Sequence, residues 1–374
     1  MYDYLIVGAG LAGCVTAERI ASQLNKKVLI VEKRNHIGGN CYDYLDSKGI
    51  LVHKYGPHAF HTTMEHVWEY LSQFTQWHPY EHKVLAHING KNVPVPFNLN
   101  SIEQIFEPEI AKEYKELLIE KYGEEKKIPI LKLIETDNNL LKELADFIYR
   151  NVFYGYTLKQ WGLNPEELDF SVSSRVPVFT GRDNRYFHDP FQRIPARGYT
   201  NMFKKMIDNP NIEIIYNKDY RKIVSDIQFG KMIYTGPVDY YFDYIHGQLP
   251  YRSLRFDYKT LQQDYFQETA QINYPNNHQY TRITEFKHFL RQENRYTTIA
   301  YEFPQDYIHE MNEPYYPIPR KENEELYKKY LAETEKLNNS VIFVGRLAEY
   351  KYYNMDQIVA VALMTFEKKI ANSE

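Results

Sequence analysis

A glycine-rich turn near the N-terminus constrains the fold of this chain more than any other feature. Tyr4–Val7 is a short apolar run, which is typical of a buried strand. Gly8, Gly10 and Gly13 follow it in the pattern Gly-x-Gly-x-x-Gly, and an alanine-rich stretch then predicts a helix that ends near Leu24. A strand that leads directly through such a turn into a helix indicates one half of a nucleotide-binding α/β unit.

A second apolar run completes this unit. Lys27–Val31 predicts another buried strand, and it ends in Glu32, about twenty residues beyond the glycines. The first glycine allows the tight turn, the second lets the backbone approach a pyrophosphate, and the third lets helix and strand pack closely. The free N–H groups at the start of the helix attract phosphates. Glu32 is predicted to accept hydrogen bonds from a ribose 2′-hydroxyl, which disfavours NADP.

The residues after Glu32 favour FAD over NAD. Gly38 and Gly39 provide another close backbone approach to an extended cofactor, and this spacing resembles the glutathione-reductase-like FAD proteins, especially their amine-oxidase branch. The sequence has no second Gly-x-Gly-x-x-Gly, so a separate NADPH domain is not expected. The cofactor contacts predicted in this region are Gly8, Gly10, Gly13, Glu32, Lys33, Gly38, Gly39 and Asn40.

The C-terminal region predicts another strand, glycine and helix of the same fold. Val341–Val344 is apolar and leads into Gly345, and a helix is expected from about Met355 to Ile370. Folds of this type close with such a unit, whose helix begins near the flavin. An arginine follows the glycine where many oxidoreductases have an acid, which indicates extra negative charge nearby. Further cofactor contacts are predicted at Gly345, Arg346, Met355 and Asp356.

The middle of the chain changes its pattern twice. Ser101–Trp161 is mainly helical in its apolar spacing, with helical segments at Glu109–Lys121 and Leu131–Tyr149, and Asn151–Gly162 is predicted to be a loop. Tyr234–Pro319 predicts short alternating strands of an antiparallel sheet, whereas Glu322–Lys336 predicts a solvated helix.

We therefore expect an α/β protein with a Rossmann-like FAD-binding fold, an inserted helical subdomain and an antiparallel β-sheet substrate domain. The predicted FAD-binding domain is discontinuous and comprises residues 1–76, 191–244 and 322–374. The helical subdomain covers residues 98–163 and ends in a substrate loop, and the sheet domain comprises residues 77–97, 164–190 and 245–321.

Composition limits the class of protein. A net charge of −4 over 374 residues gives no general attraction to nucleic acid. The longest apolar stretch, Leu5–Ala17, is too short to span a bilayer, and no basic leader is visible, so a cytoplasmic protein is expected. Cys14 and Cys41 have neither zinc-site nor disulfide spacing. The 35 tyrosines fit half-buried sheet positions as well as a cleft that binds flat ligands, and composition does not separate these two interpretations.

Several segments, taken together, resemble those of bacterial UDP-galactopyranose mutases. They run in the family's order along the whole chain: Tyr-Gly-Pro-His-Ala-Phe-His-Thr at 55–62, Gly-Tyr-Thr-Leu-Lys-Gln-Trp-Gly at 155–162, Ser-Arg-Val-Pro at 174–177, Arg-Tyr-Phe at 185–187, Thr-Arg-Ile at 281–283, Glu-Pro-Tyr-Tyr-Pro at 313–317 and Gly-Arg-Leu at 345–347. Each motif is weak alone. Their combination and order are specific.

The resemblance implies a role for each matching residue. Arg175 and Arg282 correspond to arginines that reach the substrate phosphates, and Trp161 corresponds to a loop tryptophan that stacks on uracil. Gly56 and His58 belong to the segment over the flavin ring, and His58 or His61 could assist proton transfer. The implied catalytic residues are Arg175, Arg282, His58, His61 and Arg346. The implied substrate contacts are Phe153, Tyr156, Thr157, Trp161, Tyr186, Asn273, Tyr316, Tyr352 and His82, with Tyr315 and Tyr316 left as alternatives for one phosphate contact.

The resemblance also implies the reaction. UDP-galactopyranose and UDP-galactofuranose are interconverted without net electron transfer, and N5 of reduced FAD attacks the anomeric carbon to form a covalent flavin–sugar adduct. The product would supply surface glycans with galactofuranose. An external reductant such as NAD(P)H or a flavodoxin-type protein, UDP-galactose or UDP as ligand, and a homodimer are expected. Nucleic acid and a membrane span are not.

Three alternative hypotheses apply to parts of this sequence. His53, His58, His61 and His66 lie close in sequence, but no carboxylate or thiolate joins them at ligand spacing, so no metal site is predicted. A flavin amine oxidase or desaturase shares the FAD motifs but has no need of phosphate-directed arginines. A non-catalytic module that binds nucleotide sugars is the third. Conversion of UDP-galactose under reducing conditions distinguishes the mutase from both rivals.

Overall fold

Five parallel strands form the sheet that carries the N-terminal glycine turn. The computed structural model describes residues 1–168 and 177–373. The strand order is β12 (Ile212–Ile215), β2 (Val28–Val31), β1 (Tyr2–Val7), β13 (Phe229–Tyr234) and β19 (Val341–Phe343). All neighbouring pairs are parallel. The predicted strand–turn–helix–strand unit is therefore present, with α1 (Leu11–Leu24) after the glycines.

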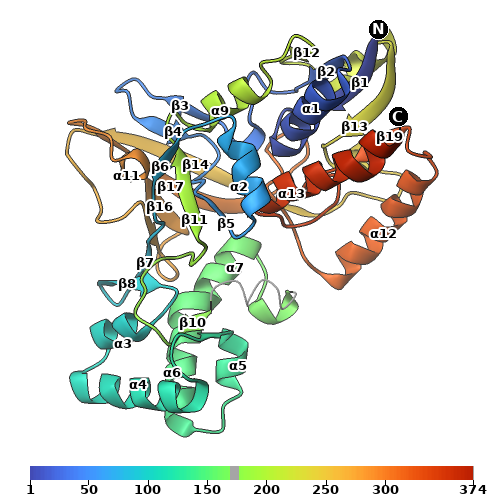
Figure 1. Cartoon of the computed structure of the whole chain (residues 1–374). Coiled ribbons are helices and arrows are strands. Elements are labelled where there is room, and N and C mark those ends of the chain that lie inside the picture. The colour runs from blue at the N-terminus through green and yellow to red at the C-terminus, as the bar shows by residue number, and fades with distance from the viewer. Residues whose placement is uncertain (169–176, 374) are drawn as a thin grey trace.

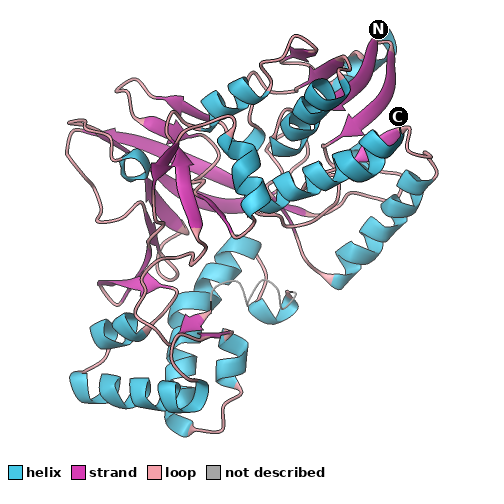
Figure 2. Ribbon diagram, viewed as in Figure 1, coloured by secondary structure: helices cyan, strands magenta, loops and turns pink. Residues whose placement is uncertain are grey.

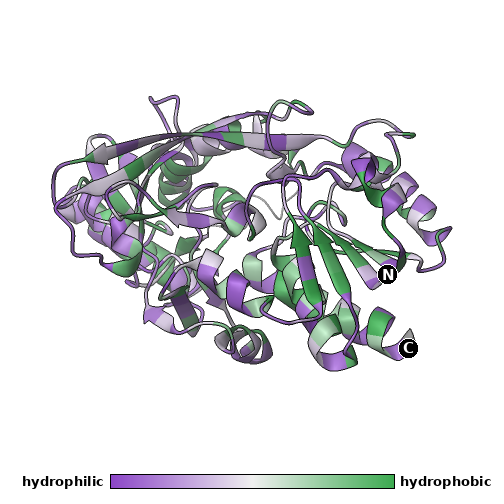
Figure 3. Ribbon diagram, turned by 90° about the horizontal axis from the view of Figure 1, so that it is seen from above, coloured by the Kyte–Doolittle hydropathy of each residue, from purple (hydrophilic) through white to green (hydrophobic). Residues whose placement is uncertain are grey.

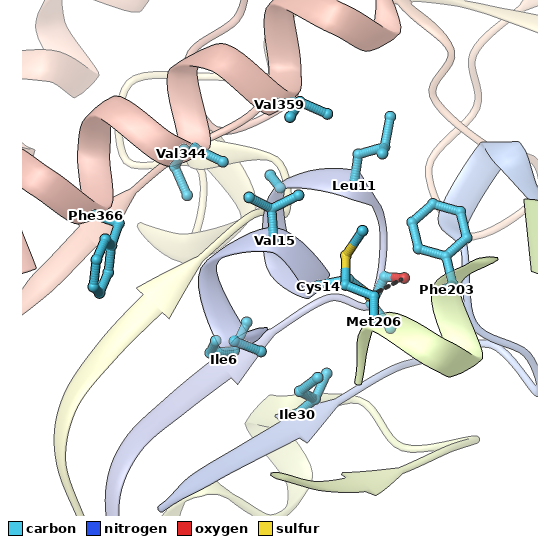
Figure 4. Packing of buried hydrophobic residues seen from close by; sticks show 14 of the residues in the cluster. Ile6, Leu11, Cys14, Val15, Ile30, Phe203, Met206, Val344, Val359 and Phe366 are labelled. Atoms are coloured by element: carbon cyan, nitrogen blue, oxygen red, sulfur yellow. Dashed lines mark hydrogen bonds between the residues drawn. The ribbon is translucent and has the colours of Figure 1, made fainter. Parts of the chain in front are cut away.

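Both faces of this sheet are covered, which explains its continuous apolar runs. Side chains such as Ile6 and Ile30 face α1, α9 (Tyr199–Met206) and α13 (Met355–Thr365) in the largest hydrophobic core. Figure 4 shows side chains from these strands and helices meeting there. The alternate positions, such as Leu5, pack into a second cluster rich in tyrosine. Figure 3 shows the apolar character of the parallel strands.

A larger mixed sheet forms a second part of the molecule (Figures 1 and 2). Its order is β18 (Tyr316–Pro317), β14 (Tyr251–Leu261), β17 (Thr297–Asp306), β16 (Arg282–Glu285), β15 (Gln271–Asn273), β7 (Val84–Ile88) and β8 (Lys91–Val95). Its pairs are antiparallel except for β15 and β7, which run parallel.

The stretch from Tyr234 to Pro319 differs from the expected series of short strands. β14 and β17 are long strands, and residues 252–261 of the first pair without interruption with residues 297–306 of the second. The short helices α10 (Val238–Tyr241) and α11 (Lys287–Leu290) also belong to this stretch.

Among the described residues, shorter strands form three further, separate sheets. β5 (Phe60–Thr62), β11 (Phe191–Pro195) and β6 (Trp77–Pro79) form an antiparallel three-stranded sheet. β3 (Asp43–Leu45) and β4 (Leu51–His53) form an antiparallel hairpin. β9 (Lys127–Ile128) and β10 (Val178–Phe179), which are distant in sequence, form a second antiparallel pair.

Helices gather at one end of the molecule, below the sheets in Figure 1. They are α3 (Leu99–Ile105), α4 (Pro108–Tyr122), α5 (Ile130–Ile134), α6 (Asn139–Ile148) and α7 (Gly155–Trp161). The helical structure predicted for Leu131–Tyr149 is present, but it is divided into α5 and α6. The Asn138 side chain accepts a hydrogen bond from the Leu141 N–H and thereby starts the second helix.

The prediction of a loop at Asn151–Gly162 is also wrong. Tyr149–Tyr154 is a π-helix that continues into α7, and the helix ends at Gly162 with a left-handed φ of 69°. Tyrosine and glycine are weak helix formers, so local preference favoured a loop. Burial of Val152 and Phe153 in the hydrophobic core of the helical part outweighs that preference.

Two further helices lie outside these groups. α2 (Glu65–Ser72) packs on the core beside β5, and α12 (Lys321–Glu335) is mainly solvated as expected, although Tyr330 is buried on its inner side. Within the described residues, no helix is both long and apolar enough to cross a bilayer.

Candidate active site

The glycine turn opens onto a pocket of about 520 Å³. Gly8 has a φ of 101°, and a Cβ on Gly13 would lie 2.0 Å from the Gly8 carbonyl oxygen, so both glycines are required by the protein backbone itself. Gly10 differs, because a Cβ there would meet no protein atom closer than 3.8 Å while the residue lines the pocket. The space beside Gly10 is thus open for a ligand that approaches the backbone.

Glu32 lies at the end of β2 and lines the same pocket. One of its carboxylate oxygens accepts a hydrogen bond of 2.7 Å from the Ala9 N–H, and the other accepts one of 2.9 Å from the Arg34 N–H. The carboxylate has further lone pairs for a ligand hydroxyl. Glu32 therefore holds the glycine turn in place as well as facing the pocket.

Charged side chains close one wall of this pocket. The Arg34 guanidinium donates to Glu313 at 2.7 Å and to the Asn40 side-chain oxygen at 3.0 Å, and the Lys33 ammonium lies 3.2 Å from Glu313. Burial opposes the charge on Arg34, but Glu313 outweighs it, and the pKa of Arg34 is raised. This wall joins the first strand unit to the loop that precedes β18.

A second pocket of about 670 Å³ lies next to the first. The two pockets share five lining residues, namely Asn40, His58, Tyr315, Arg346 and Met355. An extended ligand in the first pocket therefore reaches the second at these residues. The second pocket is otherwise lined by side chains of α7, β16, β17 and the segment 55–61.

Arg282 and Glu302 form a buried ion pair in the second pocket. Arg282 begins β16 and Glu302 lies opposite it on β17, with 2.9 Å between Arg282 Nε and Glu302 Oε1. The side chains are 17% and 2% exposed. Burial lowers the pKa of Arg282, but the Glu302 charge outweighs this effect and raises it, so the guanidinium stays protonated. Its remaining N–H groups can reach a ligand in the pocket.

His58 is held neutral where the two pockets meet. Burial lowers its pKa to about 4, and its Nδ1 lies 2.8 Å from the Gly56 carbonyl oxygen, so Nδ1 carries the proton and donates. The His58 backbone N–H donates to His53 Nδ1 at 3.0 Å. His53 is buried, which lowers its pKa to about 3 and keeps it neutral as an acceptor. Nε2 of His58 is therefore an unprotonated acceptor.

His61 and His82 also line the second pocket. His61 Nδ1 forms a short hydrogen bond with Asp189, and this contact lowers the pKa of the Asp189 carboxyl. His82 accepts or donates at Nδ1 with the Tyr80 hydroxyl at 2.9 Å, and burial lowers the pKa of His82 to about 3. His82 is therefore neutral at pH 7.

Arg346 lies between aromatic rings at the junction of the pockets. Its guanidinium carbon is 5.6 Å from the Tyr316 ring centre and 5.4 Å from that of Tyr352. Two of its nitrogens donate to backbone carbonyls, whereas Nε is buried without a partner among the described residues. An unpaired buried donor of this kind indicates a place for a ligand acceptor.

Trp161 is buried and lies on a helix, whereas its segment was predicted to be a loop. It is the last residue of α7, is 7% exposed, and its ring lies about 6 Å from those of Tyr316 and Tyr352. The helix that replaces the loop directs the ring inward. Trp161, Tyr316 and Tyr352 thus form one aromatic group at the pocket wall.

Most of the predicted site residues line these two pockets. Those at the first pocket are Gly8, Gly10, Glu32, Lys33, Gly38, Gly39, Asn40, His58, Gly345, Arg346 and Met355. Those at the second are Asn40, Gly56, His58, His61, His82, Phe153, Tyr156, Thr157, Trp161, Tyr186, Asn273, Arg282, Tyr316, Arg346, Tyr352 and Met355. Gly13 and Asp356 line neither, since Gly13 packs against Gly8 and Asp356 is buried in α13. Arg175 lies outside the described residues.

Sequence reasoning missed several residues of the site. Glu302 shares one face of β17 with the buried Ala300, so an acid on the inner face of an apolar strand was the available signal. Asp189 and Gln271 also line the second pocket, and Tyr240 and Tyr244 line the first, and neither pair carried a local motif. In the described part of the chain, no group of three or more histidine, cysteine or acidic side chains could hold a metal ion.

Comparison with known proteins identifies the family. The profile of the family described as UDP-galactopyranose mutase (GLF) matches residues 151–352, more than half of the chain, and that of an NAD(P)-binding Rossmann-like domain matches residues 6–74. The chain is a member of the UDP-galactopyranose mutase family. Members of this family are isomerases, and the matched region contains Trp161, Arg282 and Arg346.

Full-length relatives agree with this membership in the UDP-galactopyranose mutase family. A probable UDP-galactopyranose mutase of Klebsiella pneumoniae is 37% identical over all of this chain and 96% of its own length. A dTDP-fucopyranose mutase of Escherichia coli is 33% identical over the whole of both chains. A crystal structure of reduced UDP-galactopyranose mutase has the same fold, with a TM-score of 0.73 and 15% identity over all of this chain and 95% of that one.

Proposed function

We propose that this protein interconverts UDP-galactopyranose and UDP-galactofuranose without net redox change, with FAD as its cofactor. The observation that carries this proposal is the second pocket, which adjoins the dinucleotide pocket and combines a protonated arginine with a group of aromatic side chains. Arginine suits phosphate oxygens, and aromatic rings suit a uracil base. Membership in the mutase family supports the same assignment.

The first pocket fits the adenosine and pyrophosphate parts of FAD. The open space beside Gly10 suits close approach of phosphates, and Glu32 retains acceptor capacity for a ribose hydroxyl. The unpaired Arg346 Nε at the junction suits an acceptor of the flavin or sugar. We assign FAD binding to the unit of residues 1–76, 191–244 and 322–374, with residues 98–163 as the helical subdomain and residues 77–97, 164–190 and 245–321 as the sheet domain.

When bound in its reduced form, FAD supplies a nucleophile for the anomeric carbon of the sugar. The residues of this chain then have two tasks. Arg282, with Arg175 from outside the described residues, neutralises the pyrophosphate as the C1–oxygen bond breaks, and keeps UDP in the pocket until it is reattached. Arg346 is placed to stabilise negative charge on the reduced cofactor.

Other side chains bind the base and transfer protons. Trp161, Tyr156 and Phe153 enclose the uracil, with Thr157, Asn273 and His82 as further contacts, and Tyr186, Tyr316 and Tyr352 donate to phosphate oxygens. His58 offers Nε2 as an unprotonated acceptor, and His61 is oriented by Asp189. Either imidazole can therefore transfer a proton during ring opening.

A second substrate is favoured by one relative. The dTDP-fucopyranose mutase is 33% identical over the whole chain. Such a substrate differs in the methyl group on its base, in its 2′-deoxyribose and in the missing sugar 6-hydroxyl. We therefore include dTDP-fucopyranose in the activity assay as the alternative to UDP-galactopyranose.

The proposal also covers the location of the protein, its oligomeric state and its reductant. We infer a cytoplasmic homodimer that receives electrons from NAD(P)H or a flavodoxin-type protein and supplies galactofuranose for surface glycans. Size-exclusion chromatography with light scattering tests the dimer.

The deciding experiment is an isomerase assay with and without dithionite. Purified protein with bound FAD should convert UDP-galactofuranose to UDP-galactopyranose after reduction, and conversion should be absent or very slow with oxidised FAD. Bleaching of FAD by the sugar nucleotide would instead indicate an oxidase. Binding of UDP-galactose without conversion would indicate a binding module, and faster conversion of the dTDP sugar would favour the second substrate.

A further inference from the structure

An ammonium group from α7 is enclosed by backbone carbonyls of the β15–β16 hairpin. Lys159 Nζ lies 3.2 Å from the Asn276 carbonyl oxygen, 3.0 Å from that of His278 and 3.3 Å from that of Tyr280, and it forms a shorter contact with that of Tyr274. No acidic side chain in the described residues pairs with it. Four carbonyl dipoles therefore compensate one positive charge.

Two other residues of the same helical stretch contact this hairpin. The Asn276 side chain donates to the Asn151 carbonyl at 3.2 Å, and a Cβ on Gly155 would lie 2.4 Å from the Pro275 carbonyl oxygen. Asn151, Gly155 and Lys159 follow each other at intervals of four, which places them along one side of the helix. One side of this stretch is thus fitted against residues 274–280.

The two elements that meet here bear different parts of the proposed substrate site. Phe153, Tyr156 and Trp161 lie on the helical stretch, whereas Arg282 begins β16 at the end of the hairpin. α7 lies where the helical part of the chain meets the sheets (Figure 1). The position of the helix against the hairpin therefore sets the distance between the base-binding rings and the phosphate-binding guanidinium.

We propose that Lys159 is a positioning residue, whose ammonium group joins α7 to the β15–β16 hairpin and thereby fixes this distance. The inference rests on the proposed function only in its choice of UDP as ligand. Lys159 does not line either pocket, so its effect on UDP reaches the ligand through α7 and the hairpin. Alanine at this position leaves the four carbonyls without a donor, and a neutral amine would donate more weakly than the ammonium group.

The first test measures UDP affinity of the oxidised, FAD-loaded protein by calorimetry. K159A should raise the Kd for UDP at least about tenfold at pH 7, the scale of one charge-assisted hydrogen bond. K159R keeps the charge and should stay within about threefold of wild type. K142A, an exposed lysine on α6, is the matched control and should be unchanged. Methylammonium should restore UDP binding to K159A and leave K142A unaffected.

The second test uses pH. Burial lowers the pKa of Lys159 to about 8, so its protonated form, and with it UDP affinity, should be lost as pH rises through about 8. K159R should show no such loss, because guanidinium remains protonated. The neighbouring titratable and charged groups are His278, Tyr274 and Tyr280 on the hairpin, His87 on β7, and the Arg252–Asp306 pair beside the Lys159 carbonyl. They are present in both proteins and cancel in the comparison.

The outcomes are distinct. Equal UDP affinity of K159A and K142A would overturn the proposal, as would a loss that neither arginine nor methylammonium recovers. If K159A loses FAD or aggregates, the comparison of UDP affinity against pH between wild type and K159R decides. The same loss of affinity in both proteins would overturn the proposal, and a loss in wild type alone would support it. Failure of the reduced wild type to convert UDP-galactose while UDP still binds would reject the proposed reaction and leave this comparison valid.

Discussion

Arg282→Ala is the substitution that most directly probes the proposed phosphate site. Arg282 lines the second pocket, but it also compensates the charge of Glu302, which is 2% exposed and lies 2.9 Å away. The alanine variant therefore removes two things at once, a cation from the pocket and the partner of a buried carboxylate. A second substitution, Glu302→Gln, separates these effects.

The two effects have different expected magnitudes. Removing one partner of a buried ion pair lowers the free energy of unfolding by about 3–5 kcal/mol. We expect the lower end, about 3 kcal/mol, because the Thr281 hydroxyl, 3.2 Å from Glu302, still donates to the carboxylate. Loss of one cation at a developing phosphate charge lowers turnover by roughly a hundredfold. FAD content should be unchanged, since Arg282 lies outside the first pocket.

The assay compares Arg282→Ala with Arg282→Ala/Glu302→Gln. Turnover is followed with dithionite-reduced protein and UDP-galactofuranose, and stability by thermal unfolding with FAD fluorescence. The double variant should regain most of the lost stability and none of the lost turnover. Recovery of turnover would show that Arg282 acts only by compensating Glu302, and near-normal turnover of the single variant would remove Arg282 from the catalytic site.

The remaining predictions concern the cofactor, the base and pH. Gly10→Ala should fold normally, because a Cβ at this position meets no protein atom closer than 3.8 Å. It should lose most of its FAD absorbance, because the added methyl group occupies the space proposed for the phosphates, and full FAD occupancy would place the phosphates elsewhere. Trp161→Ala should raise KM at least about tenfold with a smaller change in kcat, since base stacking is similar in ground and transition states. Steady-state kinetics measure both constants, and a change mainly in kcat would contradict this prediction. Borohydride treatment of the reduced protein during turnover should yield a sugar–flavin adduct by mass spectrometry, and its absence would count against covalent catalysis. His53 and His82 have pKa values lowered by burial to about 3, so the unfolded chain binds more protons below about pH 6.5. Thermal stability should fall from pH 7 to pH 5, and His82→Gln should lessen the slope.

The sequence was sufficient to predict those strands and helices whose local residue pattern agrees with their burial in the folded protein. The first strand, the glycine turn and α1 form as predicted, because an apolar run buried on both sides and three glycines at fixed spacing allow few alternatives. The strand before Gly345 and the helix that begins at Met355 follow the same logic.

The helix at 149–161 could not be predicted, because its stability comes from distant residues. Lys159 and Gly155 contact a hairpin more than a hundred residues away, and Arg252 donates to the Gln160 carbonyl at the helix end. The residue pattern within the segment does not indicate these contacts. The same holds for Glu302, whose pairing with Arg282 depends on the register of β16 and β17. Most residues predicted from a family motif line the two pockets, whereas Glu302 and Asp189, which pair with residues distant in sequence, were not predicted.

The position of α1 against α13 has a consequence for biosynthesis. Both helices belong to one hydrophobic core, which α1 also shares with β1, β2 and α9, so this core is incomplete until α13 has been translated. The core of the helical part, by contrast, is built from residues between Val84 and Val178, all made before half of the 374-residue chain is complete. Nascent chains should therefore acquire their helical part first and enclose the first pocket only once Gly345, Arg346 and α13 have been made.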